Sequence, residues 1–162
     1  MLKKCSYIIV PFAVFMSGLY GGIGFFTLMG GNPSVNDLSL QAFAEYWQNI
    51  DHYMGSRMPV FGGSLILVLL LGVISLLPWR KTVSFWLMLL GLLLLISDLV
   101  FTLSINHPLN QLIQSWDLQN LPSNVQEIKT QVIDAFWYRA FFMLSSFACV
   151  WLAAFLKKNK QI

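Results

Sequence analysis

The chain has 162 residues, of which 57% are hydrophobic and only 10% are charged. Soluble domains carry roughly 25% charged residues, so this composition excludes an ordinary soluble domain. The formal net charge of +3 comes from short basic segments between apolar runs, and it does not indicate a nucleic-acid partner. We therefore expect lipid to surround most of the chain.

Four apolar runs predict four membrane-spanning helices. Each is close to the roughly 20 residues that cross a hydrocarbon core of about 30 Å. They cover residues 6–29, 58–77, 82–105 and 135–156. Lys3 and Lys4 before the first run also fit a signal peptide, but its apolar stretch exceeds the usual length of about 7–15 residues, so a retained anchor is expected. The whole chain, 1–162, is interpreted as a single transmembrane domain.

The first span is rich in glycine, and Gly18 and Gly22 stand four residues apart. Small residues at this spacing let two helices approach closely. Packing within the bundle is the favoured interpretation, while a homo-oligomer interface and room for a flat ligand remain open.

Two outer loops contain most of the polar residues. In the first, residues 30–34 resemble a turn, and apolar residues then recur at helical spacing from Leu38 to Ile50. This pattern predicts a short amphipathic helix that lies on the outer membrane surface or caps the bundle. The second loop has similar helical turns at 109–116, and Pro122 begins a helix that leads into the fourth span. The predicted fold is all-α, an integral membrane four-helix bundle with short amphipathic helices in its two outer loops.

Charge predicts the orientation, because short loops rich in Lys and Arg stay in the cytoplasm. The turn at 78–81 is basic and short, and it makes the second and third spans antiparallel neighbours. With the N- and C-termini in the cytoplasm, most basic residues fall inside, and we expect a multi-pass protein of a bacterial inner membrane. Cys5 and Cys149 lack Cys-x-x-Cys spacing and are interpreted as packing residues.

Asp98 is an acidic residue inside the third span, where a carboxylate costs roughly 2.5–3.5 kcal/mol on insertion scales. Thr102 and Asn106 follow at steps of four and continue one polar stripe. An ion pair with Arg139 or Arg57 is one explanation of Asp98. The other is a general base in a dry pocket.

The two histidines, His52 and His107, both fall at the outer boundary, where histidine can act as an acid or base near neutral pH. Hydrogen bonding at the interface is the simpler role for each. No ligand spacing supports a metal, and none is predicted. Trp137 belongs to an outer group of aromatic residues that fits an interface belt and is dense enough to line a ligand pocket.

The segment 106–110, Asn-His-Pro-Leu-Asn, stands at the outer end of the third span. Together with the Trp-rich entry to the fourth span and the glycine-rich first span, it resembles the anthrone oxygenase-like family of small four-helix membrane proteins. That resemblance implies cofactor-independent oxygenation of anthrones to anthraquinones. The resemblance assigns the family's functional residues to Asn106, Pro108 and Asn110 by motif, and more loosely to Trp137. Arg139 is a weaker match, because the family's fourth-span arginine usually stands a few residues further from its tryptophan.

The leading hypothesis is an oxygenase-type membrane enzyme that acts without a cofactor on an aromatic or quinone-like lipophile. Its expected partners are membrane lipids, a lipophilic small molecule and further copies of the chain, with no nucleic acid. The alternative is a non-enzymatic binding or accessory subunit in which Asp98 and Arg139 form a structural ion pair, and a transporter comes third. The catalytic candidates are Asp98, His107 and His52; the substrate-binding candidates are Asn106, Asn110, Arg57, Trp137 and Arg139.

Overall fold

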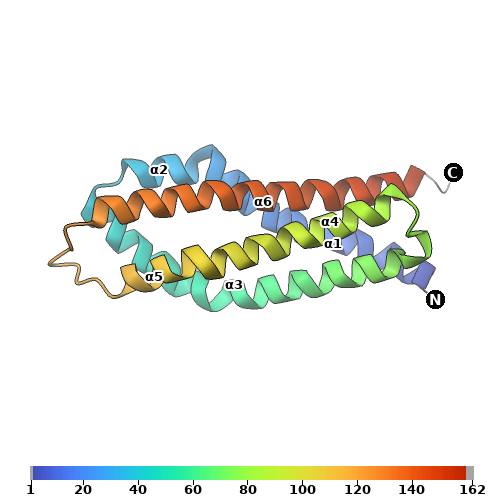
Figure 1. Cartoon of the computed structure of the whole chain (residues 1–162), viewed down its shortest axis with the longest axis horizontal. Helices are drawn as coiled ribbons and strands as arrows, with labels where there is room; N and C mark the ends of the chain where they lie inside the picture. The colour runs from blue at the N-terminus through green and yellow to red at the C-terminus, as the bar shows by residue number, and fades with distance from the viewer. Residues whose placement is uncertain (1, 160–162) are drawn as a thin grey trace.

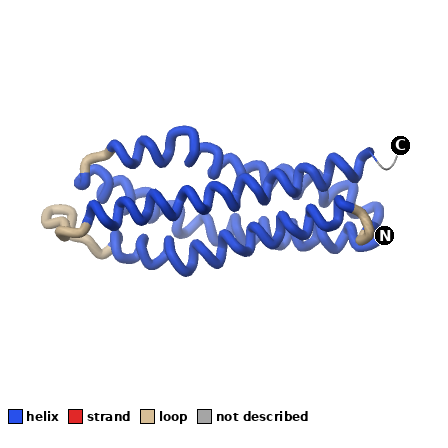
Figure 2. The backbone as a smooth tube through the Cα atoms, turned by 45° about the horizontal axis from the view of Figure 1, so that its top comes forward, coloured by secondary structure: helices blue, strands red, loops and turns tan. Residues whose placement is uncertain are grey.

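The computed structural model describes residues 2–159, and these are almost entirely helical, with no strand among them (Figure 2). Four helical runs in this range are long and apolar enough to cross a membrane. The predicted all-α four-helix architecture is therefore confirmed. The helices are α1 (Leu2–Phe26), α2 (Asn32–Asp37), α3 (Leu40–Leu76), α4 (Val83–Phe101), α5 (His107–Gln114) and α6 (Val125–Asn159).

The four long helices run side by side along one axis, and α1 begins at the end of the bundle where α6 finishes (Figure 1). Helix α6 packs against α1 and α4, and α3 packs against the same two helices. Helices α1 and α4 are consequently diagonal to each other. A polar contact between them has to cross the centre of the bundle.

Helix α3 is much longer than a membrane span. Its 37 residues extend about 55 Å, against a hydrocarbon core of about 30 Å. The side chain of Ser39 caps its start by accepting a hydrogen bond from the Ala42 amide at 3.2 Å. The amphipathic helix predicted after Leu38 is thus the first half of α3, and it stands along the bundle axis instead of lying on the membrane surface.

The predicted turn at residues 30–34 is helical. A π-helical turn, Thr27–Gly31, leads directly into α2, and the chain reverses at Leu38–Ser39 instead. Pro33 fits this arrangement because proline is tolerated in the first turn of a helix, where its missing N–H has no intrahelical partner.

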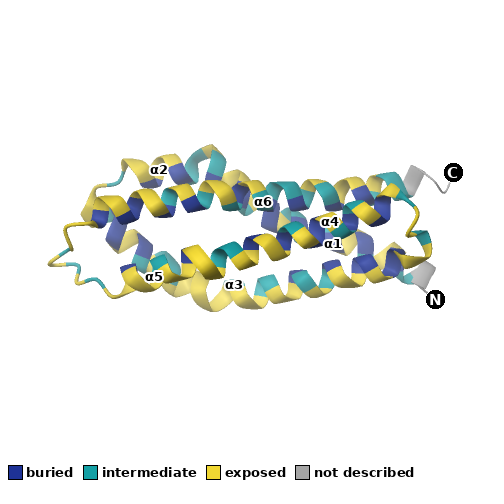
Figure 3. Cartoon of the chain, in the orientation of Figure 1, coloured by how far each residue is buried: buried dark blue, intermediate teal, exposed yellow. Residues whose placement is uncertain are grey.

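Two separate hydrophobic cores hold the helices together, and the buried residues follow the inner faces of the bundle (Figure 3). The larger core lies among the membrane-spanning parts of α1, α3, α4 and α6. The smaller one occupies the end opposite the termini, which we call the head: α2, α5 and the first halves of α3 and α6. It is built from Val35, Phe43, Trp47, Ile113, Val125, Ile128 and Val132.

Lys129 shows how the head is closed. Its side chain is buried, and its ammonium donates to the backbone carbonyls of Asn36 at 2.8 Å and Leu38 at 2.5 Å. These carbonyls end α2 and begin the link to α3, where no backbone donor continues the helix. The head, where outer aromatic residues were dense enough in the sequence to line a ligand pocket, is therefore packed with side chains.

Candidate functional site

Asp98 lies in the centre of the bundle with only 2% of its surface exposed. Arg139 on α6 donates from Nε to one carboxylate oxygen at 3.1 Å and from Nη2 to the other at 3.4 Å. Tyr20 on α1 donates its hydroxyl hydrogen to the second oxygen. Three helices thus converge on one carboxylate.

This cluster is inside the membrane-spanning part of the chain. Asp98 lies about 22 Å along α4 from its start at Val83, given a rise of 1.5 Å per residue. Tyr20 lies about the same distance along α1 from Cys5. If the hydrocarbon core of about 30 Å begins near Val83 and Cys5, both groups lie within it, about 8 Å from its boundary at the head end.

Arg139 is enclosed on its other side by an aromatic ring. The centre of its guanidinium lies 5.1 Å from the centroid of the Phe136 ring, and its side chain is 12% exposed. Nη1 donates none of the hydrogen bonds to Asp98. A cation held in this way can neutralise Asp98 and still present donors to a second anion.

The polar stripe beyond Asp98 is real, and part of it has no protein partner. Asn106 is 1% exposed, and neither its amide nitrogen nor its oxygen makes a hydrogen bond to protein. The buried hydroxyl of Thr102 lacks a partner too. Both residues belong to a π-helical turn, Thr102–Asn106, and such turns often occur at functional positions.

The second asparagine of the motif, Asn110, has protein partners at both of its polar atoms. It accepts from Trp47 Nε1 at 3.0 Å and donates to Asp51 Oδ1 at 2.5 Å. Gln114, one turn later on α5, donates to the other oxygen of Asp51 at 3.3 Å. Asn110 therefore joins α5 to α3.

The remaining candidates lie on the surface. His52 is exposed and contacts the ring of Tyr53 with centroids 5.1 Å apart. Arg57 is exposed too, and the centre of its guanidinium lies 5.2 Å from the centroid of the Tyr53 ring. His107 and Trp137 are exposed as well. The structure thus brings Asp98 and Arg139 together and leaves both histidines, Arg57 and Trp137 outside that cluster.

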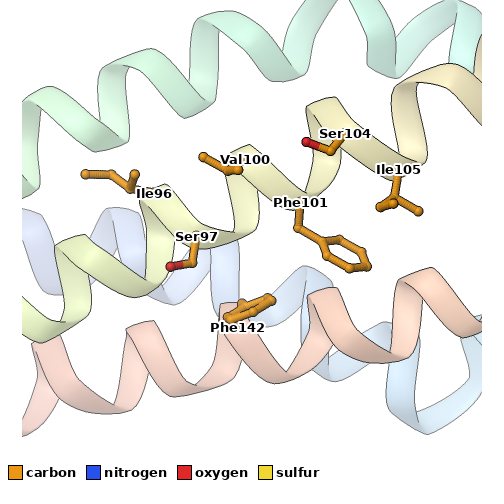
Figure 4. A pocket seen from close by; sticks show the side chains of 7 residues that line it. All are labelled: Ile96, Ser97, Val100, Phe101, Ser104, Ile105 and Phe142. Atoms are coloured by element: carbon orange, nitrogen blue, oxygen red, sulfur yellow. The ribbon is translucent and has the colours of Figure 1, made fainter.

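One hollow opens on the lipid-facing side of the α4–α6 seam, next to the buried cluster (Figure 4). It measures about 500 Å³ and is open and shallow. The rings of Phe101 and Phe142 form its wall toward α6, with centroids 6.3 Å apart. Phe101 follows Asp98 by about one helical turn, and Phe142 follows Arg139 in the same way, so the hollow lies at a similar height in the bundle as the ion pair, although neither Asp98 nor Arg139 lines it.

Sequence reasoning missed three members of these networks: Tyr20, Asp51 and Trp47. Tyr20 had a signal, because a tyrosine in the middle of an apolar span needs a partner for its hydroxyl. Asp51 stands out in the sequence only as the neighbour of His52, and Trp47 fits the outer aromatic belt. In the part of the chain that the structure describes, no three His, Cys, Asp or Glu side chains gather as metal ligands.

Comparison with protein families identifies a match. The profile of a protein family described as anthrone oxygenase matches residues 47–149, which is more than half of the chain. The matched region contains α4, α5, most of α3 and α6, and the residues Asp98, Asn106, Asn110 and Arg139. No curated protein and no solved structure matches the chain.

Proposed function

This chain belongs to the anthrone oxygenase family, and from that premise we propose that it is a cofactor-independent oxygenase for an aromatic or quinone-like lipophile dissolved in the membrane. The observation that carries the proposal is the buried carboxylate of Asp98, held in the membrane-spanning region beside a guanidinium with donors to spare.

The reaction requires a base and an oxyanion partner. In an anthrone, a CH₂ group lies between two aromatic rings, opposite a ketone. Removal of one proton gives an enolate whose charge spreads onto the ketone oxygen. That carbanion reduces O₂ and forms a C–O bond, and after taking up a proton it becomes a hydroperoxide. Loss of the second C–H proton and cleavage of the O–O bond then release water, so that CH₂ and O₂ become C=O and H₂O.

Asp98 and Arg139 supply these two roles. Asp98 accepts the proton from the CH₂ group, and Arg139 stabilises the negative oxygen of the enolate through a donor that Asp98 does not use. Tyr20 orients the carboxylate by donating to one of its oxygens. In a medium without bulk water these electrostatic interactions are stronger than at a protein surface.

A lipophilic substrate would approach from the bilayer. The hollow beside Phe101 and Phe142 offers aromatic surface at the depth of the ion pair. A rotation of the Phe101 and Phe142 side chains away from each other would let a flat substrate reach Arg139. The Arg139 side chain is 12% exposed before any such movement.

A second candidate function is a non-enzymatic membrane subunit. The observation in its favour is that Asp98 is fully paired, with Arg139 on both oxygens and Tyr20 on one, which is what a purely structural buried carboxylate needs. In this case the ion pair only holds α1, α4 and α6 together.

The test is oxygen uptake by purified protein in lipid nanodiscs supplied with 1,8-dihydroxyanthrone and a metal chelator. Wild-type protein is expected to exceed the spontaneous oxidation seen with empty nanodiscs, with formation of the anthraquinone at one O₂ per product. Asp98→Asn should abolish this excess. Asp134→Asn, which changes an exposed carboxylate on α6, should retain it.

The double variant Asp98→Asn with Arg139→Gln separates the two functions. It replaces the ion pair by two neutral groups and leaves no uncompensated charge. The enzyme proposal expects a stable and inactive protein. Equal oxygen uptake by wild type, double variant and empty nanodiscs would contradict the proposal and favour the structural subunit.

A further inference from the structure

Three partnerless polar atoms lie between the buried carboxylate and the head. They are the Thr102 hydroxyl and both polar atoms of the Asn106 side chain. A buried polar group without a hydrogen bond costs roughly 1–3 kcal/mol, so three adjacent ones require an explanation. Asn106 is enclosed by the protein, with only 1% of its surface exposed.

The stripe is regular. Asp98, Thr102, Asn106 and Asn110 follow one another at steps of four along α4, its π-helical turn and α5. Each step of four rotates a side chain by about 40° in an α-helix. The π-helical turn from Thr102 to Asn106 holds an extra residue, which offsets that rotation and keeps the stripe directed into the bundle.

The spacing matches water. Four residues rise about 6 Å along an α-helix, and one water molecule that bridges two polar groups at its near-tetrahedral angle spans about 4.5 Å through two hydrogen bonds of about 2.8 Å. One or two waters therefore connect neighbouring side chains of the stripe. The Thr102 hydroxyl can donate and accept, and the Asn106 amide offers two donors and an acceptor, which are the partners that a buried water requires.

The stripe ends where the protein meets the aqueous phase. Asn110 donates to Asp51 at 2.5 Å, and Gln114 donates to the same carboxylate at 3.3 Å. Asp51 is half-buried and Gln114 is exposed. At the other end the titratable groups on the neighbouring helices are Tyr20 and Arg139, both bonded to Asp98.

We propose that Thr102 and Asn106 bind a short file of internal water molecules, and that this file is a proton path between Asp98 and the aqueous phase at Asp51. Protonated Asp98 gives its proton to the first water, and that water passes one of its own protons to the next. Each water thus accepts one proton and gives one, and the proton that leaves the file is taken up at Asp51. The same path returns protons to Asp98. Thr102 relays through its hydroxyl, and Asn106 is a positioning residue that holds the waters in line.

This proposal does not depend on the oxygenase activity, because it concerns only access of water and protons to Asp98. For an enzyme it explains how a base inside the bilayer is reset after each turnover. For a structural subunit the water file still satisfies the three polar atoms. The two proposals can therefore fail separately.

The first test is water-edited solid-state NMR of protein labelled with ¹⁵N-asparagine in lipid bilayers. Transfer from water to the Asn106 side-chain amide is expected to be fast, and its signal is identified by its loss in Asn106→Leu. Asn32 is the matched control, because it is also buried, with 5% of its surface exposed, and it donates to the Ile133 carbonyl at 3.0 Å. Transfer to Asn106 as slow as that to Asn32 would overturn the water site.

The second test measures proton access to the cluster itself. The chain has three arginines, Arg57, Arg80 and Arg139, so ¹⁵Nε-arginine labelling gives three Nε–H signals. After transfer to D₂O, the Arg139 signal is expected to exchange about tenfold more slowly in Thr102→Val with Asn106→Leu than in wild type, because exchange then waits for local opening. Arg57 and Arg80, both exposed, should be unchanged and report on the fold. An unchanged Arg139 rate in a folded double variant would rule out the path.

Discussion

Tyr20 on α1 and Asp98 on α4 are joined by a hydrogen bond across the diagonal of the bundle. Diagonal helices share almost no direct packing. The hydrogen bond therefore fixes the separation between α1 and α4, which their packing against α3 and α6 sets only indirectly. Because Arg139 on α6 binds the same carboxylate, one acidic side chain sets the relative height of three helices.

Tyr20→Phe is expected to destabilise the bundle while keeping its shape. The ring remains, and only the donor to a buried carboxylate is lost, which costs about 1.5–3 kcal/mol for a hydrogen bond to a charged group. Thermal unfolding in nanodiscs measures the effect. Tyr46→Phe, at an exposed tyrosine with 41% of its surface accessible, is the control, and equal losses for the two variants would contradict the importance of the cross-bundle bond.

The Asp98 and Arg139 variants are expected to be strongly non-additive. Either Asp98→Asn or Arg139→Gln alone leaves one buried charge without its partner and should cost about 3–5 kcal/mol. The double variant should recover most of that loss, because it buries neutral groups that can still bond to each other. Unfolding of all four proteins gives the coupling energy; simple addition of the two single effects would mean that the pair is not coupled.

Much of the fold could be predicted from the sequence, because the hydrocarbon core demands long apolar runs and forbids unpaired backbone. The continuity of α3 could not. Its first half has apolar residues on one face and Gln41, Glu45 and Gln48 on the other, which is the pattern of a helix lying on a membrane and equally that of a helix packed in a protruding head. Only the second core, around Phe43 and Trp47, distinguishes the two.

The site was partly predictable for a similar reason. A carboxylate in a span calls for a cation, and sequence offered Arg139 and Arg57; the structure pairs Asp98 with Arg139 and leaves Arg57 on the surface over Tyr53. The partnership with Tyr20 depends on which faces of α1 and α4 point to the centre. Periodicity in an all-apolar helix does not give that rotation, since no polar face marks the outside.

Gly91→Ala is expected to push α4 away from α6. A Cβ there would stand 2.7 Å from Val150 Cγ2 and 3.2 Å from the backbone oxygen of Ser146, which also donates its hydroxyl to the Gly91 carbonyl at 2.8 Å. Overpacking of this kind costs about 1–3 kcal/mol, and the stiff valine cannot turn aside. Gly63→Ala, where a Cβ meets nothing within 4 Å, should be neutral or stabilising by up to about 1 kcal/mol through helix propensity. Thermal unfolding that ranks the two variants in the opposite order would show that the α4–α6 contact is loose.

Asn110→Ala is expected to loosen α5 from α3 without affecting the membrane-spanning bundle. It removes the acceptor of Trp47 Nε1 and a donor to Asp51, and the buried indole then has no partner, at a cost of about 1–3 kcal/mol. Hydrogen exchange should accelerate in residues 107–114 and remain unchanged in α4. Asn49→Ala is the matched control, because Asn49 is exposed and donates only to the Glu45 carbonyl of its own helix at 2.8 Å. Equal rates of amide hydrogen exchange in α5 for Asn110→Ala and Asn49→Ala would show that Asn110 does not anchor the head. The role of Asn110 would then have to be sought in contact with a ligand.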